Sequence, residues 1–425
     1  MNNNFEMNLS LLERVNPVFN TAKTTLYQLS GAGDTDAAAI AEKLGLTLEG
    51  TQNTENTTAL PEQLLAGIIN MEARFKTMSK LAEQSQCSVI VDLPCGYTPR
   101  AIKTARKGQR FIGLDLPATI TEAEPAILSL IEPEKQKLVK FSAVDATNYA
   151  TLKAALEDES GEVCITTEGL LMYFTDSETG VLCDNIRRIL EERGGVWLTT
   201  DPEITLFYVL TLQAICGDRF MEIMNNAKQQ MTDKSDVILG GSRLLIKLQD
   251  AAGGMRTAMG FLASHGLKAE RMILHDHLPE LNSLSKLTPE QAAAFTENMK
   301  KCAFWKITLA GSTKQLDASE AESRDFKVSA NLDAGTLNMA FTGRLDTITS
   351  PNLLAFYEEH KDQVKAVHID CKNLDYVSSA GLRVLLIMQK GCTGGVTIFG
   401  VNDVVKEILE QTGFDSVINI EESVN

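Results

Sequence analysis

Acidic side chains recur in this sequence at the ends of short apolar stretches that have the composition of β-strands. These stretches end at Asp92, Asp115, Asp145, Glu168 and Asp201. Helical stretches separate them, which predicts a parallel sheet whose strands all end at one edge. Ligands of open α/β sheets bind beyond that edge, so we expect the carboxyl groups to line one binding site. The alternative for each single acid is a helix N-cap, a position that Asp favours.

The turn after the first of these strands narrows down the ligand. It reads Asp92-Leu93-Pro94-Cys95-Gly96, whereas a dinucleotide site would need the three glycines of a GxGxxG turn. The sequence has no P-loop either. Carboxylates can accept hydrogen bonds from ribose hydroxyls and from an adenine amino group, and they favour a positive centre nearby. S-adenosylmethionine offers all of these groups without a phosphate, so it is the predicted cofactor.

Three stretches also carry a resemblance to a known family. They are VIVDLPCGYTPRAI (89–102), FIGLDLP (111–117) and TTEGLLMYFTDSE (166–178). They resemble the leucine carboxyl methyltransferases and their polyketide O-methyltransferase-like branch, which are class I S-adenosylmethionine-dependent methyltransferases. The resemblance covers roughly residues 10–310 and implies a Rossmann-like, seven-stranded α/β domain with N-terminal helices. It implies O-methylation of a carboxyl or hydroxyl group on a small molecule or peptide.

The same resemblance implies which residues bind the cofactor. Asp115 would hold the ribose, Asp145 the adenine amino group, and Arg74 the carboxylate of the methionine part. The residues assigned to the cofactor in this way are Arg74, Asp92, Leu93, Pro94, Cys95, Gly96, Asp115, Leu116, Asp145, Ala146 and Glu168. Methyl transfer depends on positioning of the acceptor rather than on a covalent enzyme intermediate, so no catalytic triad is expected.

One residue departs from the family pattern. The family usually has Gly where this chain has Pro94, and proline provides no backbone N–H near the ligand. An alternative function therefore stays open, in which the domain senses S-adenosylmethionine without turnover and acts through the C-terminal domain.

The acceptor pocket is harder to predict. A helical insertion at 202–250 is expected to cap it, and Tyr173, Phe207, Tyr208 and Arg219 are candidates to line it. Core packing is the alternative for each of them. No metal site is expected, because the HDH run at 275–277 has too few partners among the five histidines.

A second site is predicted near the C-terminus. Ser378 and Ser379 precede an apolar helix, where a serine can cap the helix and a phosphate would face its positive end. The stretches FTGRLDTITSPNL (341–353), HIDCKNLDYVSSAGLRVLL (368–386) and IFGVNDVVKEILEQTGFDSV (398–417) resemble the STAS family of anti-sigma factor antagonists. The resemblance implies phosphorylation of Ser379, with Asp346 and Asp375 nearby, and a regulatory kinase or an anti-sigma-type protein as partner.

The elements that position both sites predict an α/β chain in four parts. These are an N-terminal helical region (1–85), a methyltransferase domain (86–310), a polar linker (311–325) and a small α/β STAS domain (326–425). The later domain is expected to begin with a hairpin that turns at Asp333-Ala334-Gly335.

Composition limits the partners and the location. The 425 residues carry a formal net charge of −16 and no dense basic run, which disfavours nucleic acid. The eight cysteines are scattered and predict neither disulfides nor a zinc site. No secretion signal and no apolar run of about 18 residues stands out, so we expect a cytoplasmic protein without a membrane span.

Overall fold

The computed structural model describes residues 18–46, 61–223, 242–246, 250–311 and 326–421. Close contacts divide the chain into two units, one covering Phe19–Lys314 and the other containing Gln315–Asn425. The helices before residue 86 thus belong to the same unit as the strands that follow them.

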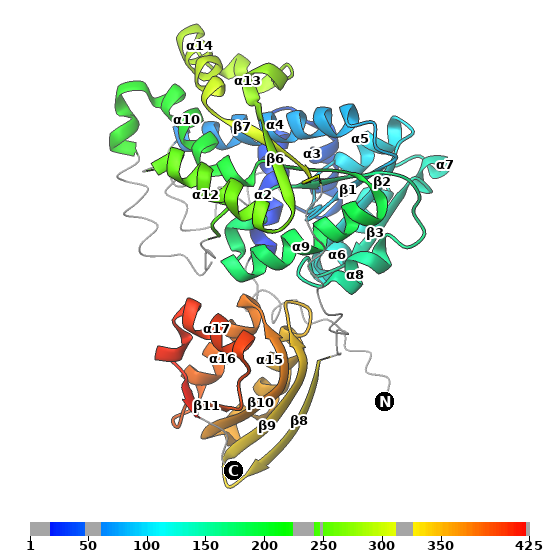
Figure 1. Ribbon diagram of the computed structural model, residues 1–425. Coiled ribbons are helices and arrows are strands. Elements are labelled where there is room, and N and C mark those ends of the chain that lie inside the picture. The colour runs from blue at the N-terminus through cyan, green and yellow to red at the C-terminus, as the bar shows by residue number, and fades with distance from the viewer. Residues whose placement is uncertain (1–17, 47–60, 224–241, 247–249, 312–325, 422–425) are drawn as a thin grey trace. The chain divides into compact units, whose positions relative to one another are not determined.

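The N-terminal unit is a seven-stranded sheet with helices on both faces (Figure 1). The strand order is β3-β2-β1-β4-β5-β7-β6. The strands are β1 (Val89–Asp92), β2 (Arg110–Asp115), β3 (Val139–Ala143), β4 (Val163–Thr167), β5 (Gly195–Thr199), β6 (Leu267–Ile273) and β7 (Ala303–Leu309). The order reverses between β1 and β4, and their carboxyl ends therefore flank the crevice where such sheets bind ligands.

Helices connect and cover these strands. In Figure 1, α4 and α5 lie on one side of the sheet, and α8 and α9 lie on the other. The α-helices among the described residues of this unit are α2 (Val18–Gly31), α3 (Thr35–Lys43), α4 (Pro61–Gln84), α5 (Arg100–Arg106), α6 (Pro117–Leu128), α7 (Pro133–Gln136), α8 (Tyr149–Ala155), α9 (Asp176–Arg193), α10 (Ile204–Cys216), α12 (Ala251–Ser264), α13 (Leu274–His277) and α14 (Pro289–Asn298). Short 3₁₀ turns are η1 (Leu171–Tyr173), η2 (Asp201–Glu203), η3 (Gly217–Arg219), η5 (Asn282–Lys286) and η6 (Met299–Lys301).

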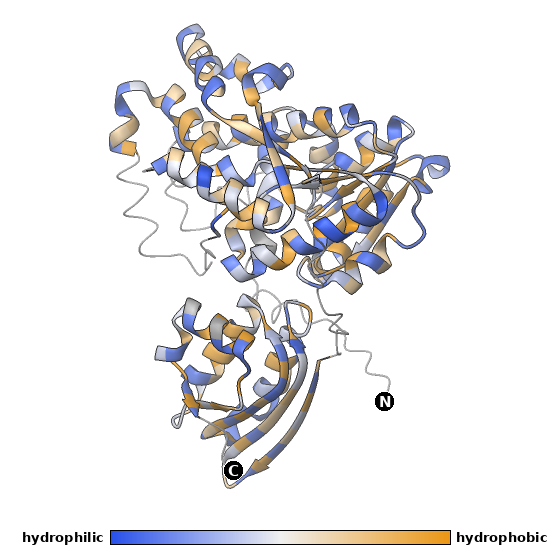
Figure 2. Ribbon diagram, in the orientation of Figure 1, coloured by the Kyte–Doolittle hydropathy of each residue, from blue (hydrophilic) through white to orange (hydrophobic). Residues whose placement is uncertain are grey.

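Local sequence explains several of these boundaries. Asp34 caps α3 by accepting hydrogen bonds from two backbone N–H groups, as its Asp-Thr start predicts. Thr175 and Glu178 form a capping box that starts α9. Hydrophobic residues run along the strands of the sheet (Figure 2). The side chains of Val91, Ile165 and Trp197 belong to one buried core.

The five strands β1 to β5 run parallel to one another, as predicted. The strand β7, in contrast, pairs antiparallel with both β5 and β6. After β6 the chain stays at the carboxyl edge through α13 and α14, so the next strand must start there and run backwards. His275 and His277 lie on α13, not on a strand end. Among the described residues no group of three or more His, Cys, Asp or Glu side chains could hold a metal ion.

One apolar stretch is longer than expected. By length and composition alone, the helical segment Asp201–Ile223 could cross a membrane. Within it, however, Phe207, Leu210 and Leu212 are buried in the unit, and α10 packs against α4 and α14. Core helices pass the same length and composition test, and the absence of a membrane span stays a prediction.

The C-terminal unit is a five-stranded sheet in the order β12-β11-β10-β9-β8. The strands are β8 (Lys327–Asp333), β9 (Thr336–Leu345), β10 (Ala366–Val377), β11 (Val396–Phe399) and β12 (Asn419–Glu421), with helices α15 (Ser350–His360), α16 (Ser379–Gly391) and α17 (Asp403–Thr412) and turns η7 (Lys361–Gln363) and η8 (Phe414–Ser416). The predicted hairpin is confirmed, since Ala334 and Gly335 join β8 to β9 with positive φ angles of 48° and 88°.

Candidate functional site

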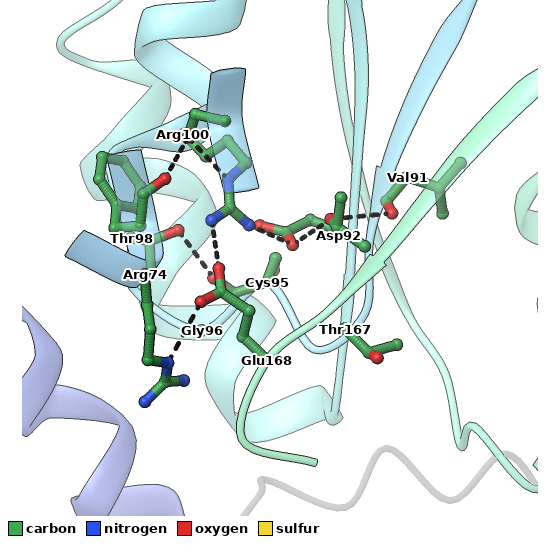
Figure 3. Close-up of polar contacts among 12 residues, drawn as sticks. Arg74, Val91, Asp92, Cys95, Gly96, Thr98, Arg100, Thr167 and Glu168 are labelled. Atoms are coloured by element: carbon green, nitrogen blue, oxygen red, sulfur yellow. Dashed lines mark hydrogen bonds and ion pairs between the residues drawn. The ribbon is translucent and has the colours of Figure 1, made fainter. Parts of the chain in front are cut away.

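A buried arginine joins the ends of β1 and β4. The Arg100 guanidinium, at the start of α5, donates from Nη1 to Asp92 Oδ1 at 2.6 Å and from Nη2 to Glu168 Oε2 (Figure 3). Arg100 is 2% exposed and its guanidinium also lies 5.1 Å from the centre of the Phe75 ring. Burial disfavours the charged guanidinium, but the carboxylates of Asp92 and Glu168 outweigh it and raise the pKa of Arg100. Arg100 is not among the residues predicted for the site.

Asp92 is held on two sides and still has an unused oxygen. Its Oδ1 accepts hydrogen bonds from Arg100 and, at 2.6 Å, from Thr166 Oγ1. Its Oδ2 is buried and has no hydrogen-bond partner. Burial raises the pKa of Asp92, and the positive charge of Arg100 opposes that shift. A buried acceptor without a partner is rare in folded proteins, and here it lies at the crevice.

Glu168 receives a second cation from α4. Arg74 Nε lies 3.5 Å from Glu168 Oε1, and both side chains are 11% exposed (Figure 3). The structure thus brings Arg74, Asp92 and Glu168 together, as the resemblance implies. Both acids, however, pair with cationic side chains of the protein and not with a positively charged ligand.

The turn after β1 is fixed by Asp115. The Leu93–Pro94 peptide bond is cis. Cys95, whose thiol is buried, donates its N–H to Leu114 O at 2.9 Å. Asp115 Oδ2 accepts from Gly96 N at 2.8 Å, and its Oδ1 accepts from Leu116 N at 2.7 Å. Burial raises the pKa of Asp115 to about 6, although these N–H groups oppose the shift.

Two glycines leave open space at the crevice. Gly96 follows β1 with a φ of 52°, and Gly169 follows β4 with a φ of 72°. A Cβ atom built on either glycine would meet nothing within 4 Å. Because the positive φ also disfavours other residues, both positions keep the backbone accessible beside Asp92 and Glu168. The open space beside these two glycines and the unpartnered Asp92 Oδ2 fit a bound cofactor that carries hydrogen-bond donors.

The acids after β3 and β5 accept hydrogen bonds from nearby loops, and neither is a helix N-cap, because Asn148 caps α8 and Thr200 precedes η2. Asp145 Oδ1 accepts from Thr147 N at 2.7 Å and from its Oγ1 at 2.6 Å. The carbonyl oxygen of Ala146 accepts from Asn185 Nδ2 at 2.9 Å. Asp201, 1% exposed, accepts from the N–H groups of residues 169–171 at 2.6 to 2.9 Å. Asp201 is therefore not the N-cap of its own helix, since Thr200 holds that position at η2, and its carboxylate instead binds the loop after β4.

The four acceptor-pocket candidates do not gather at one place. Tyr173 ends η1, directly after the loop that Asp201 holds. Phe207 is 3% exposed in the core, whereas Tyr208 on α10 is half-buried and burial raises its pKa. Arg219 Nη1 pairs with Glu62 at 2.6 Å, and Glu62 lies on α4 about 18 Å along the axis from Arg74. Residues 224–241 and 247–249 of the predicted insertion lie outside the described residues.

The serine site of the C-terminal unit lies where β9 and β10 end. Ser378 Oγ accepts from Gly381 N at 3.2 Å and caps α16, while its own N–H donates to Leu345 O at 2.9 Å. Ser379 is the first residue of α16 and is half-buried. Because Leu345 pairs with Val377, Asp346 and Ser378 are neighbours at this edge. Asp375 is exposed on β10.

Comparison with known proteins gives a family match for the C-terminal unit. The family model of the STAS domain matches residues 327–425, which confirms that resemblance for the C-terminal unit. An anti-sigma factor antagonist from Mycobacterium paratuberculosis is 18% identical, with a TM-score of 0.22, and the match covers 24% of this chain and 88% of that chain. A search of curated proteins gave no match.

Similar structures for the N-terminal part are methyltransferases. An O-methyltransferase family protein from Burkholderia thailandensis is 12% identical, with a TM-score of 0.33, over 71% of this chain and 73% of that one. Human N-acetylserotonin methyltransferase, solved with S-adenosylmethionine, is 10% identical, with a TM-score of 0.31, over 64% and 62%. These likenesses are distant, and the strand order of the sheet defines the fold.

Proposed function

We propose that the protein is an S-adenosylmethionine-dependent O-methyltransferase whose STAS domain serves regulation or partner docking. The observation that carries the proposal is the crevice between β1 and β4. There, the unpartnered Asp92 Oδ2 and the open backbone of Gly96 and Gly169 adjoin the paired acids. When bound, S-adenosylmethionine would supply an activated methyl group, while Arg74, Asp92 and Glu168 would hold its methionine part and Asp115 its ribose.

Calorimetry with S-adenosylmethionine tests the cofactor assignment. We expect binding by the full chain, and Asp115→Ala should weaken it at least tenfold. Asp158→Ala is the matched control, because it removes a carboxylate whose side chain is 88% exposed and 3.8 Å from Lys140. No heat of binding at millimolar ligand, or equal effects of both substitutions, would contradict the assignment.

A sensor without turnover is the second candidate, and Pro94 is the observation that favours it. The turn after β1 lacks the N–H that another residue would provide there. Transfer of a labelled methyl group from S-adenosylmethionine to any acceptor in a lysate of the native cell separates the two functions. Transfer would exclude a purely sensory role, whereas binding without transfer would favour it.

For the STAS domain we propose docking to a regulatory kinase or an anti-sigma-type protein, with Ser379 as the phosphorylated residue. Its place at the start of α16 supports this, because the positive end of the helix dipole favours a phosphate there. Mass spectrometry of the protein from its native cell tests the modification. An unmodified Ser379 under all growth conditions, with normal partner binding by Ser379→Asp, would argue against it.

A further inference from the structure

A single guanidinium contacts both acids at the crevice. Arg100 Nη1 donates to Asp92 Oδ1 at 2.6 Å, and its Nη2 donates to Glu168 Oε2 (Figure 3). Asp92 is the last residue of β1, and Glu168 directly follows β4, the neighbouring strand. One planar group therefore joins the ends of two strands and takes one oxygen of each acid.

Helix α4 holds this guanidinium in place. Arg100 Nε donates to Ser79 Oγ at 3.2 Å, and the guanidinium lies 5.1 Å from the centre of the Phe75 ring. The Ser79 hydroxyl in turn donates to Phe75 O at 2.7 Å. Both residues belong to α4, the helix that also carries Arg74. Because these contacts orient the guanidinium, they also set the direction in which its N–H groups meet the two acids.

The three charged side chains differ in their access to a ligand. The side chain of Glu168 is 11% exposed, whereas those of Arg100 and Asp92 are 3% and 2% exposed. Glu168 precedes Gly169, where an added Cβ atom would meet nothing within 4 Å. Among the described residues, Glu168 Oε1 accepts no hydrogen bond, although Arg74 Nε lies 3.5 Å away. Arg100 can therefore affect a ligand only through the acids that it holds.

Stability alone does not explain such a group at this place. Buried ion pairs are often no more stabilising than apolar side chains of similar size, because charges are costly to remove from water. We propose that Arg100 is a positioning residue for the methionine part of S-adenosylmethionine and acts through Glu168 and Asp92. Its two N–H donors fix both carboxylates before the cofactor binds. This inference rests on the proposed function.

Positioning of this kind favours binding for a definite reason. A glutamate without a fixed partner samples several rotamers, and ordering its side chain on binding costs free energy. Glu168 is already held at one oxygen, so the cofactor meets it in one orientation. A lysine would carry the same charge but lacks the planar fork of donors. The inference therefore assigns the effect to the geometry of Arg100 and not to its charge alone.

Calorimetry of the full chain with two ligands tests this role. S-adenosylhomocysteine carries the amino-acid part, whereas 5′-methylthioadenosine has the same nucleoside without it. Arg100→Lys should raise the Kd for S-adenosylhomocysteine by about tenfold or more, because charge-assisted hydrogen bonds to both acids are disturbed. The Kd for 5′-methylthioadenosine should stay the same, since that ligand does not reach Glu168.

A milder variant and a matched control accompany this experiment. Ser79→Ala removes the hydrogen bond to Arg100 Nε and keeps every charge, so it should raise the Kd for S-adenosylhomocysteine severalfold. Arg106→Met removes a cation from the same helix that pairs with Asp36, and it should change neither Kd. Circular dichroism and thermal melting establish that each variant is folded.

A double variant shows whether Arg100 acts through Glu168. Residues that act as one unit have effects that do not add. Arg100→Lys combined with Glu168→Gln should therefore bind S-adenosylhomocysteine about as weakly as Glu168→Gln alone. Additive losses would mean that Arg100 acts by another route, and the inference would be wrong.

The pair of ligands also separates positioning from a general structural role. Equal weakening of both ligands by Arg100→Lys would overturn the inference, and so would an unchanged Kd for S-adenosylhomocysteine in both Arg100→Lys and Ser79→Ala. Either result leaves the proposed function in place as long as the wild type binds S-adenosylmethionine. A wild type that binds neither S-adenosylmethionine nor S-adenosylhomocysteine would overturn both.

Discussion

Arg100, Asp92 and Glu168 depend on one another because all three charges are removed from water. Arg100→Met would leave two buried carboxylates with a single nearby cation, Arg74. We expect this substitution to lower the free energy of unfolding by about 3–5 kcal/mol, as loss of one member of a buried ion pair does. Urea denaturation followed by circular dichroism measures the change.

Arg106→Met is the matched control for that experiment. Arg106 lies on the same helix and pairs with Asp36, but its side chain is 44% exposed. Asp36 is itself buried, but Lys103 Nζ also lies 3.1 Å from its Oδ2 and remains in the variant, so a small effect of roughly 0–1 kcal/mol is expected for the loss of the exposed cation. Similar losses in the two variants would mean that the buried network has no special role in stability.

Asp115 should make stability depend on pH. Its pKa in the folded protein is about 6, above its ordinary value of 3.8, because the carboxyl is buried. The folded state therefore holds a proton that the unfolded state has released, and the stability this gives is lost as pH rises through about 6. Relative to Asp115→Asn, the wild type should lose roughly 1–3 kcal/mol between pH 4.5 and pH 7.

Urea denaturation of both proteins across that range measures this difference. The variant also disturbs the hydrogen bonds from Gly96 and Leu116, but that cost is nearly constant with pH and cancels in the slope. A difference in free energy that stays flat from pH 4.5 to pH 7 would show that Asp115 is ionised throughout.

Sequence patterns located the acids of the site but not their partners. Asp92, Asp115 and Glu168 could be predicted because each ends a strand, and strand ends share one edge of a parallel sheet. Arg100 could not, since its pairing with Glu168, 68 residues later, depends on how α5 and α4 pack over the sheet. No local signal distinguishes it, because Arg100 is one of four basic residues in the stretch RAIKTARK (100–107).

At the scale of elements, the start of α16 is packed tightly against the end of β9. A Cβ atom added to Gly381 would lie 2.7 Å from Leu345 O and 2.8 Å from Leu345 Cγ. Gly381→Ala should therefore destabilise the STAS domain by about 1–3 kcal/mol, as overpacking usually does. Thermal melting detects the loss.

A second glycine-to-alanine change serves as the control. Gly260 also lies in a helix, α12, but a Cβ atom there would meet nothing within 4 Å. Gly260→Ala should leave stability unchanged or raise it by up to about 1 kcal/mol, because alanine favours helix. If Gly381→Ala behaved in the same way, α16 could move away from β9 at little cost.

Helices and strands whose sequence shows an apolar pattern or a turn residue could be predicted from the sequence. Features that depend on pairing between distant segments could not. The strands β1 to β5 and the β8–β9 hairpin follow from apolar runs and turn residues. The reversed direction of β7 depends on where α14 returns the chain, which local sequence does not encode. β10 extends to Val377 through two register shifts against β9, beyond the apolar run at 365–371 that predicted it.

At the scale of the whole chain, each unit has its own hydrophobic core. One core joins Val91, Ile165 and Trp197, and the other joins Phe341, Ile369 and Leu385. Neither of these described clusters includes residues of the other unit. Units with separate cores unfold independently when few contacts couple them. We therefore expect scanning calorimetry of the full chain to show two transitions.

The Gly381→Ala variant and S-adenosylmethionine show which transition belongs to which unit. Gly381→Ala should lower the Tm of one transition only, because the strain lies within the C-terminal core. S-adenosylmethionine at 100 times its Kd should stabilise the other unit by about 2.7 kcal/mol, since a ligand stabilises only the unit that binds it. A single transition that moves with both changes would instead mean that the two units unfold as one, and a ligand of either unit would then stabilise both.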